Sequence, residues 1–510
     1  MKHLLARDAF ESVKLMPTSS PLWQRLCELV DDMAIEQKPR LIDEIASLHL
    51  LRNDSNWLRY GALAYLTRDP DCFSQQAACA DSETPPDAIM NLLGLVWYHA
   101  LARAPESQAF VQLLRDSNAP GLQRLVAKRL PALMKARPRI GMGLRVAIYT
   151  PQIMNNRHGG TTFTINMMSV AALIGMECRT FTAQEVNIPV ANAHCGAPEL
   201  LTQSVAETDS LVLHASVNVQ MVLPNVGFSL RLRFEQMLEA VHAYKPDLII
   251  FVGFISPLVY RLYESYPVVG LSLHALPPVA PVDVWLSADP HGDATLWPDI
   301  TAPQNFHYPF RFWPKGQAVP MDRAQLGIPV SNVILITTGH RLNTEMPQAW
   351  LDRMLAFTNA HPDVHWLLVG LPQGHMVAGL PEHPRIHSVE PQTELDSWLA
   401  TCDIYINPPR VGGGSTVAMA MEQGLAVLTL ADGDGGDKVG DWAVASQDDY
   451  FVQLSIWVGN PTARKQVGEA LKKQFHARLD VSSTPAQEGL VQACHAAIKS
   501  FNLRTEAVNA

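Results

Sequence analysis

The chain of 510 residues is too long for one hydrophobic core of ordinary size, and domains of about 100–200 residues imply two to four of them. A content of 47% hydrophobic and 17% charged residues is typical of packed globular domains and excludes a disordered chain. The net charge of −10 argues against nucleic acid as the main partner, because phosphate-binding surfaces usually leave a basic balance.

Cysteine usage and hydropathy indicate the compartment. The seven cysteines are scattered and form no C-x-x-C pair, so we expect neither disulfides nor a zinc site. Charged residues follow Met1 too closely for a secretory signal peptide. No apolar run reaches the roughly 20 residues that cross a bilayer. We therefore expect a cytoplasmic protein that has no transmembrane segment and holds no metal.

Residues 1–138 predict an all-helical domain. Turn and helix-start signals such as Asp69-Pro70-Asp71 separate its apolar runs. The first of these runs shows helical spacing at Trp23, Leu26, Cys27, Val30 and Met33. Two roles are open for this domain: a cap that stabilises the rest of the chain, or a surface that docks a protein substrate.

Residues 144–314 predict a first Rossmann-like domain. Short apolar strands alternate with helices, which is typical of a parallel sheet covered on both faces. The expected strands are 144–150, 177–181, 248–252 and 268–273, and the expected helices are 161–174 and 230–244.

Residues 315–510 predict a second Rossmann-like domain with C-terminal helices, because the pattern restarts after a proline-rich segment, 308–314. The expected strands are 333–338, 365–370, 386–389, 404–407 and 426–430, and the expected helices are 348–358, 394–400 and 416–422. Ligands of doubly wound sheets bind beyond the carboxyl ends of the strands. The fold class is therefore α/β, with two such sheets facing one cleft.

The strongest local signal begins at Asn407, where a strand leads into a glycine turn and the turn leads into a helix. Glycine N–H groups approach a phosphate closely, the helix N-terminus favours negative charge, and hydroxyl groups add donors. The candidate ligands of the nucleotide sugar in this segment are Asn407, Gly412, Gly413, Gly414, Ser415 and Thr416. A tight turn with a Ser/Thr helix cap is the alternative. Three consecutive glycines exceed what a cap needs, so phosphate binding is favoured.

A second candidate group follows the strand 333–338 and comprises Thr338, His340 and Arg341. The forked donors of Arg341 can neutralise a diphosphate. An exposed loop arginine is the alternative. The position at the carboxyl end of a strand favours the functional interpretation.

Two turns of the first domain carry histidines. His274 follows the strand 268–273 and can act as a general base or bind the acceptor or the leaving phosphate. A structural histidine is the alternative. His158, Gly159 and Gly160 form the first strand-to-helix turn, which can face the acceptor or the sugar, or can simply start a helix.

These motifs, in this order, resemble those of the HMW1C-like protein glycosyltransferases, relatives of the O-GlcNAc transferase family. The family's histidine loop is matched by His274 with Asp283-Val284-Trp285 at similar spacing. Its phosphate-contacting lysine is matched by Arg341, and its Asn-Pro-rich nucleotide loop is matched by 407–416. Met419 stands where a ribose-binding carboxylate is expected.

The resemblance implies a GT-B fold and a bacterial, inverting, metal-independent enzyme without a cofactor. It implies hexose transfer from a UDP-sugar to a protein acceptor, namely asparagine side chains of an adhesin-type protein. Three alternatives stay open. They are transfer to a lipid or polysaccharide, a non-catalytic GT-B-like binding protein, and a sugar epimerase with the same two-sheet architecture.

Overall fold

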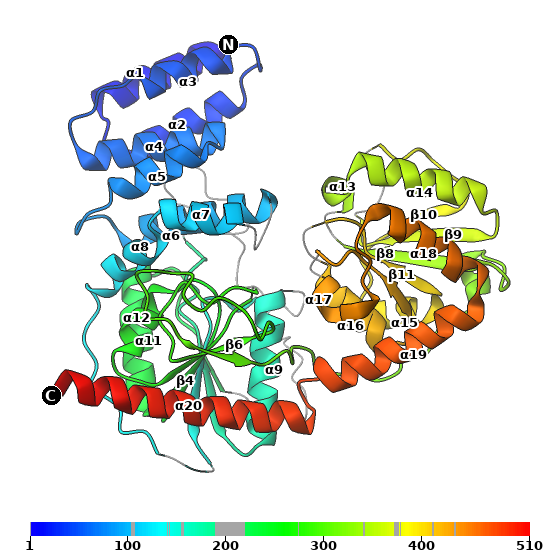
Figure 1. Cartoon of the computed structure of the whole chain (residues 1–510). Coiled ribbons are helices and arrows are strands. Elements are labelled where there is room, and N and C mark those ends of the chain that lie inside the picture. Colours follow the sequence, from blue (N-terminus) through cyan, green and yellow to red (C-terminus); the bar gives the residue numbers. More distant parts are fainter. Residues whose placement is uncertain are drawn as a thin grey trace. The chain divides into compact units, whose positions relative to one another are not determined.

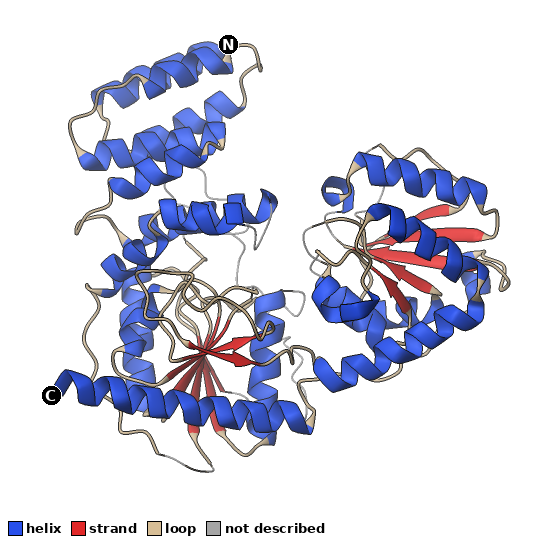
Figure 2. Ribbon diagram, viewed as in Figure 1, coloured by secondary structure: helices blue, strands red, loops and turns tan. Residues whose placement is uncertain are grey.

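The computed structural model describes residues 2–103, 108–139, 141, 143–154, 158–188, 220–273, 275–339, 342–371, 377, 379–410, 413–432 and 435–509. The chain forms two compact units. The first contains Met1–Pro309 and Gln487–Ala510, and the second contains Phe310–Ala486. Each unit is built on one parallel sheet (Figures 1 and 2), which confirms the predicted α/β class.

The first unit begins with helices only, as predicted. Their bounds are α1 Lys2–Leu15, α2 Ser20–Asp31, α3 Lys38–Ala46, α4 Asn53–Thr67, α5 Pro70–Ala78, α6 Pro86–Arg103, α7 Gln108–Asp116 and α8 Ala119–Ala127. The apolar residues from Trp23 to Met33 that carry the helical spacing are buried. Their hydrophobic core is continuous with that of the following sheet. Such a shared core is what a stabilising cap requires.

The seven-stranded sheet of the first unit has the order β3-β2-β1-β4-β5-β6-β7, and every described pair is parallel. Its strands are β1 Arg145–Tyr149, β2 Glu177–Phe181, β3 Gln220–Val222, β4 Leu248–Val252, β5 Val268–Leu271, β6 Val284–Ser287 and β7 Gln304–His307. The sequence pattern misses β3, β6 and β7. They are short, and β7 is a polar strand at the edge, so none carries a long apolar run.

Helices cover both faces of this sheet (Figure 2). They are α9 Gly159–Leu173 on one face, and α11 Leu230–Tyr244 and α12 Pro257–Tyr263 on the other. The chain moves outward from β1 in one direction and from β4 in the other. Right-handed crossovers then place the helices on opposite faces. The switch point, where such sheets bind ligands, lies between β1 and β4.

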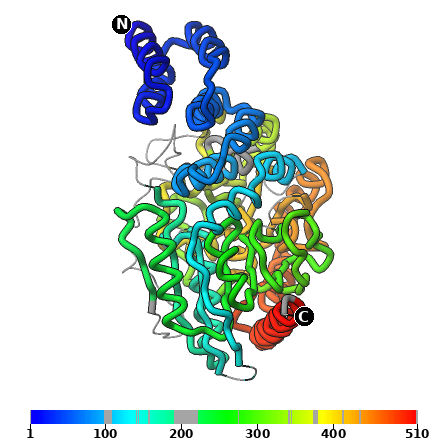
Figure 3. The backbone as a smooth tube through the Cα atoms, turned by 90° about the vertical axis from the view of Figure 1, so that its left-hand side faces the viewer, coloured from blue at the N-terminus to red at the C-terminus, as the bar shows by residue number. Residues whose placement is uncertain are grey.

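The C-terminal helix α20, Thr484–Asn509, belongs mostly to the first unit. Ser500 and Arg504 each donate a hydrogen bond of 3.0 Å to Oδ1 of buried Asp283. In Figure 3, α20 and the helices α1–α5 lie at opposite ends of this unit. The structure therefore differs from the predicted domain 315–510. The reason is that an amphipathic helix at the end of a chain does not reveal which core it packs on.

The five-stranded sheet of the second unit has the order β10-β9-β8-β11-β12 and is also parallel. Its strands are β8 Val333–Thr338, β9 Val364–Val369, β10 Ile386–Val389, β11 Ile404–Ile406 and β12 Ala426–Leu428. Its helices are α13 Leu342–Glu345, α14 Gln348–Ala360, α15 Leu395–Thr401, α16 Gly414–Glu422, α17 Gly436–Val439, α18 Gln447–Gly459 and α19 Pro461–Arg478, with 3₁₀ turns at Arg323–Leu326 and Gly440–Trp442. All five strands match predicted ones. The switch point lies between β8 and β11.

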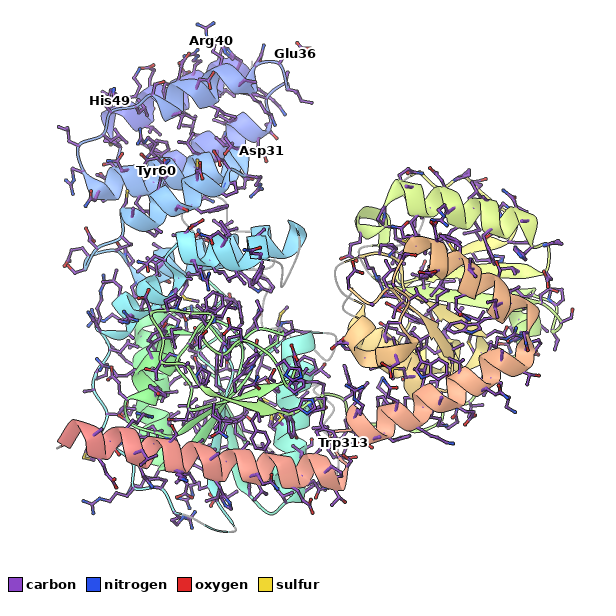
Figure 4. All side chains as sticks on the ribbon, in the orientation of Figure 1. Asp31, Glu36, Arg40, His49, Tyr60 and Trp313 are labelled. Atoms are coloured by element: carbon purple, nitrogen blue, oxygen red, sulfur yellow. The ribbon has the colours of Figure 1, made fainter. Side chains whose placement is uncertain are left out.

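The segments that enter and leave the second unit run side by side. The amides of Arg311 and Phe312 donate to the carbonyl of Leu479, and the amide of Val481 donates to the carbonyl of Phe312. Trp313 follows directly after this pairing (Figure 4). Across the described ranges, no helix is both long and apolar enough to cross a membrane.

Candidate functional site

The carboxyl ends of β8 and β11 meet at the switch point of the second sheet, because these strands are neighbours and parallel. Thr338 ends β8, and Asn407 directly follows β11. The two candidate groups that the sequence places 69 residues apart, at 338 and 407, therefore belong to one edge of one sheet. Ligands of doubly wound sheets bind at this place.

The glycine turn starts helix α16 without a side-chain cap. Gly413 is the N-cap residue, with φ of 91°, and Gly414 is the first helical residue. Ser415 and Thr416 lie inside the first turn of the helix, where Ser415 is exposed and Thr416 is half-buried. A Ser/Thr cap, the alternative to phosphate binding, is thus absent. The N-terminus of α16 therefore combines the N–H groups of a first helical turn with the exposed hydroxyl of Ser415 beside them.

Glycine allows close packing against one side chain at two positions of this edge. A Cβ at Gly413 would lie 2.5 Å from Nη2 of Arg410 and 2.6 Å from Oδ1 of Asn407. The positive φ adds a conformational reason at Gly413. A Cβ at Gly339, directly after β8, would lie 2.5 Å from Nη1 of Arg410. Both turns therefore rest against the same guanidinium group.

Asn407 lies beneath the turn, and its side chain is buried. Its Oδ1 accepts a hydrogen bond of 3.1 Å from Nε of Arg410, and its Nδ2 donates one of 3.2 Å to Oγ1 of Thr429. The hydroxyl of Tyr450 donates to its carbonyl at 3.2 Å. In this structure Asn407 therefore supports the turn from inside the protein. Thr338 is also buried, and its Oγ1 has no hydrogen-bond partner among the described residues.

Arg410 is the residue that the sequence interpretation overlooks. Its guanidinium donates to the carbonyl of Thr338 at 2.7 Å and lies 3.8 Å from the carboxylate of Glu345. Its side chain is only 2% exposed. A charged residue between two prolines and three glycines indicates a surface loop, so the sequence offers no signal for this burial.

Met419 lies on α16, four residues after Ser415, where it is half-buried and packs against the core of the second unit. Side chains at this spacing lie one above the other on a helix. The position expected to bind a ribose is therefore on the same face as the candidate phosphate ligands. Its thioether offers only a weak acceptor.

In the first unit, His158 is the N-cap of α9. Its Nδ1 accepts a hydrogen bond of 3.2 Å from the amide of Thr161 and lies 3.0 Å from the hydroxyl of the same residue. Burial lowers the pKa of His158 to about 4. A Cβ at Gly160 would lie 2.9 Å from the His158 ring and 3.2 Å from Leu273, whereas Gly159 faces open space. The turn at Gly160 therefore packs close to Leu273, the residue that precedes His274 in the sequence.

A cluster of buried polar groups lies at the carboxyl ends of β1, β2 and β4, and the sequence interpretation does not include it. Tyr149 and Ser256 both donate hydrogen bonds to Oε1 of fully buried Glu185, the second at 2.6 Å. Burial raises the pKa of Glu185 to about 7, although the two hydroxyls oppose this shift. On α11, buried Arg233 donates to the carbonyls of Ala183 and Gln184. These bonds fix the loop that follows β2.

His274, His340, Arg341 and Gly412 lie outside the described residues. The structure describes the strands that precede them, β5, β8 and β11. Within the described ranges, no group of three or more His, Cys, Asp or Glu side chains is suited to hold a metal ion.

No protein-family model and no curated protein matches the chain. Among solved structures, it is similar to a variant of the O-GlcNAc transferase of Thermobaculum terrenum, with a TM-score of 0.55 and 13% identity over 97% of this chain and 94% of that chain. It also matches the glycosyltransferase of kitacinnamycin, with a TM-score of 0.44 and 12% identity over 69% of this chain and 100% of that chain. The first match shows that the chain has the GT-B fold.

Proposed function

We propose that this protein is a glycosyltransferase that binds the diphosphate of a nucleotide sugar at the glycine turn of its second unit. The observation that carries this proposal is the turn Gly413–Thr416 at the carboxyl edge of the sheet. It leads into a helix N-terminus, lacks a side-chain cap and exposes the side chain of Ser415. Negative charge is favoured at such a position.

In the form that the family resemblance suggests, the enzyme is HMW1C-like, cytoplasmic, inverting and independent of metal. It transfers a hexose from a UDP-sugar to asparagine side chains of an adhesin-type protein. This finer assignment rests on the matches at His274, Arg341 and 407–416. Transfer to a lipid or polysaccharide is the alternative within the same class.

The proposed reaction is a direct displacement at the anomeric carbon. The acceptor nitrogen forms a bond to this carbon while the bond to the diphosphate oxygen breaks. His274 either orients the acceptor or takes its proton. Negative charge grows on the departing diphosphate, where Arg341 and the N–H groups of the glycine turn offset it.

The test replaces Arg341 by Ala and measures UDP release from UDP-glucose with and without an acceptor protein. We expect turnover to fall by about 100-fold or more, since donors of this kind are worth about 2.7–4 kcal/mol each. The control is Arg353→Ala on α14, where the side chain is 39% exposed and pairs with Asp448 on the surface. Wild-type turnover in Arg341→Ala would refute this assignment. No UDP release by the wild-type protein despite nucleotide binding would favour a non-catalytic binding protein.

A further inference from the structure

The side chain of Arg410 lies between the two turns at the carboxyl edge of the second sheet. Its Nη2 donates to the carbonyl oxygen of Thr338 at 2.7 Å, at the end of β8. Its Nε donates to Oδ1 of Asn407 at 3.1 Å, directly after β11. One guanidinium thus bridges the ends of both strands that flank the switch point.

On each side of the guanidinium group, a glycine lets the backbone approach closely. A Cβ at Gly339 or at Gly413 would lie 2.5 Å from a guanidinium nitrogen, Nη1 in one case and Nη2 in the other. Such contacts are too short for real carbon atoms. The guanidinium therefore lies in contact with both the turn after β8 and the turn after β11, at the edge where these paired strands end.

The charge of Arg410 is buried close to the candidate phosphate site. Three of its neighbours are neutral acceptors, namely the Thr338 carbonyl, the Asn407 amide and the Tyr405 hydroxyl at 3.4 Å. The carboxylate of Glu345 forms an ion pair with Nη1 at 3.8 Å, which is longer than a hydrogen bond and offsets part of the charge. A cation in this environment raises the potential at the start of α16, where the helix end already favours an anion.

We infer that Arg410 is the positioning residue of the anion site. It ties the end of β8 to the turn that starts α16, and it adds buried positive charge beside this turn. The identity of the anion as the diphosphate of a nucleotide sugar rests on the proposed function. Arg410 itself does not contact the ligand.

Arg323 is a matched control for Arg410, because it bonds to the other ends of the same two strands. Arg323 donates to the carbonyl of Asn332 at 3.1 Å, before β8, and to the carbonyl of Thr401 at 2.8 Å, before β11. It also pairs with Asp403 at 3.0 Å. Arg323 therefore bridges the amino ends of β8 and β11, as Arg410 bridges their carboxyl ends. Loss of either bridge removes similar bonds, but only one bridge lies at the anion site.

The experiment compares the variants Arg410→Met, Arg410→Lys and Arg323→Met in the full-length chain. Calorimetry measures their affinity for UDP, uridine and inorganic pyrophosphate, and thermal unfolding reports stability. In Arg410→Met we expect binding of UDP and pyrophosphate to weaken about tenfold or more, with uridine binding unchanged. Arg410→Lys keeps the charge but not the forked donors, so we expect an intermediate loss. Arg323→Met should lose stability and keep its affinities.

A fourth variant tests the geometry without removing the charge. Gly339→Ala places a methyl group against Nη1 of Arg410, so we expect it to weaken pyrophosphate binding. In the background Arg410→Ala, the same substitution should have a much smaller effect. Gly339→Ala and Arg410→Lys keep a cation at position 410, so these two variants carry the test if Arg410→Met does not fold.

The results distinguish the positioning role of Arg410 from the proposed nucleotide-sugar donor. Unchanged UDP and pyrophosphate affinities in Arg410→Met, or equal losses of uridine and UDP binding, would overturn the positioning role. A wild-type protein that binds pyrophosphate but no nucleotide, with weaker pyrophosphate binding in Arg410→Met, would keep the positioning role and refute the donor assignment. A wild-type protein that binds neither probe would refute both.

Discussion

The Nδ1 atom of His158 accepts a hydrogen bond from the backbone amide of Thr161 at 3.2 Å, so this histidine is the N-cap of α9. An accepting Nδ1 carries no proton, and burial lowers the pKa of the ring to about 4. His158 is therefore neutral near pH 7 and serves the helix start, which was the structural alternative for this turn.

Replacement of His158 by Ala should lower the free energy of unfolding by about 1 kcal/mol, because a side-chain cap is lost. His158→Asn should restore most of it, since asparagine is a good N-cap. The pKa of the folded state lies below the unfolded value of 6.5. Wild-type stability should therefore fall from pH 6.5 towards pH 4, and His158→Asn should lack this contribution. Urea unfolding at pH 7 and pH 5 checks both expectations. Equal pH dependence in both proteins would contradict the neutral cap.

Glu185 should produce the opposite pH dependence. Its folded pKa of about 7 lies above the unfolded value of 4.5, so the folded state keeps its proton longer. The stabilisation is complete below pH 4.5 and is lost as the pH rises to about 7. Between pH 4.5 and 8, the free energy of unfolding of the wild type should fall by about 3 kcal/mol relative to Glu185→Gln. Parallel stability curves for the two proteins would show that the carboxyl group does not titrate in this range.

The contact of α20 with the first sheet depends on the pair Asp283 and Arg504. The Asp283 side chain is fully buried, so the loss of its cation leaves a buried charge poorly compensated. Arg504→Ala should reduce stability by about 3 kcal/mol and accelerate hydrogen exchange along α20. A second change, Asp283→Asn, should recover part of this loss because it removes the charge. The surface variant Lys499→Ala on the same helix is the control, and equal effects of Lys499→Ala and Arg504→Ala would rule out the ion pair as the cause.

Variants of Met419 test where the ribose of the nucleotide binds. A thioether is a weak acceptor for ribose hydroxyls, so the wild-type protein should bind UDP and 2′-deoxy-UDP with similar affinity. Met419→Glu adds a carboxylate on the face of α16 that carries Ser415, and we expect about a tenfold preference for UDP. Calorimetric titration of both nucleotides measures the preference. A Met419→Glu protein without preference would place the ribose elsewhere, and Met419→Leu is the control for altered packing.

Much of the fold could be predicted from the sequence. The strands around the centre of each sheet, such as β1, β4 and β8, are continuous apolar runs with turn signals at their ends. Burial on both faces imposes this composition, so the residues report it directly. The short strands β3 and β6 and the edge strand β7 do not have such runs, because their pairing depends on neighbours elsewhere in the chain.

The sequence by itself determined the α/β class and the glycine turn before α16, because hydrophobic periodicity and glycine geometry are local properties. Only the tertiary structure decided that Arg410 is buried between Gly339 and Gly413, that His158 caps a helix, and that α20 packs on the first unit. Each of these depends on contacts between residues distant in the sequence or on the exact path of a turn. The burial and partners of a polar side chain follow from those contacts, and residue type alone does not encode them.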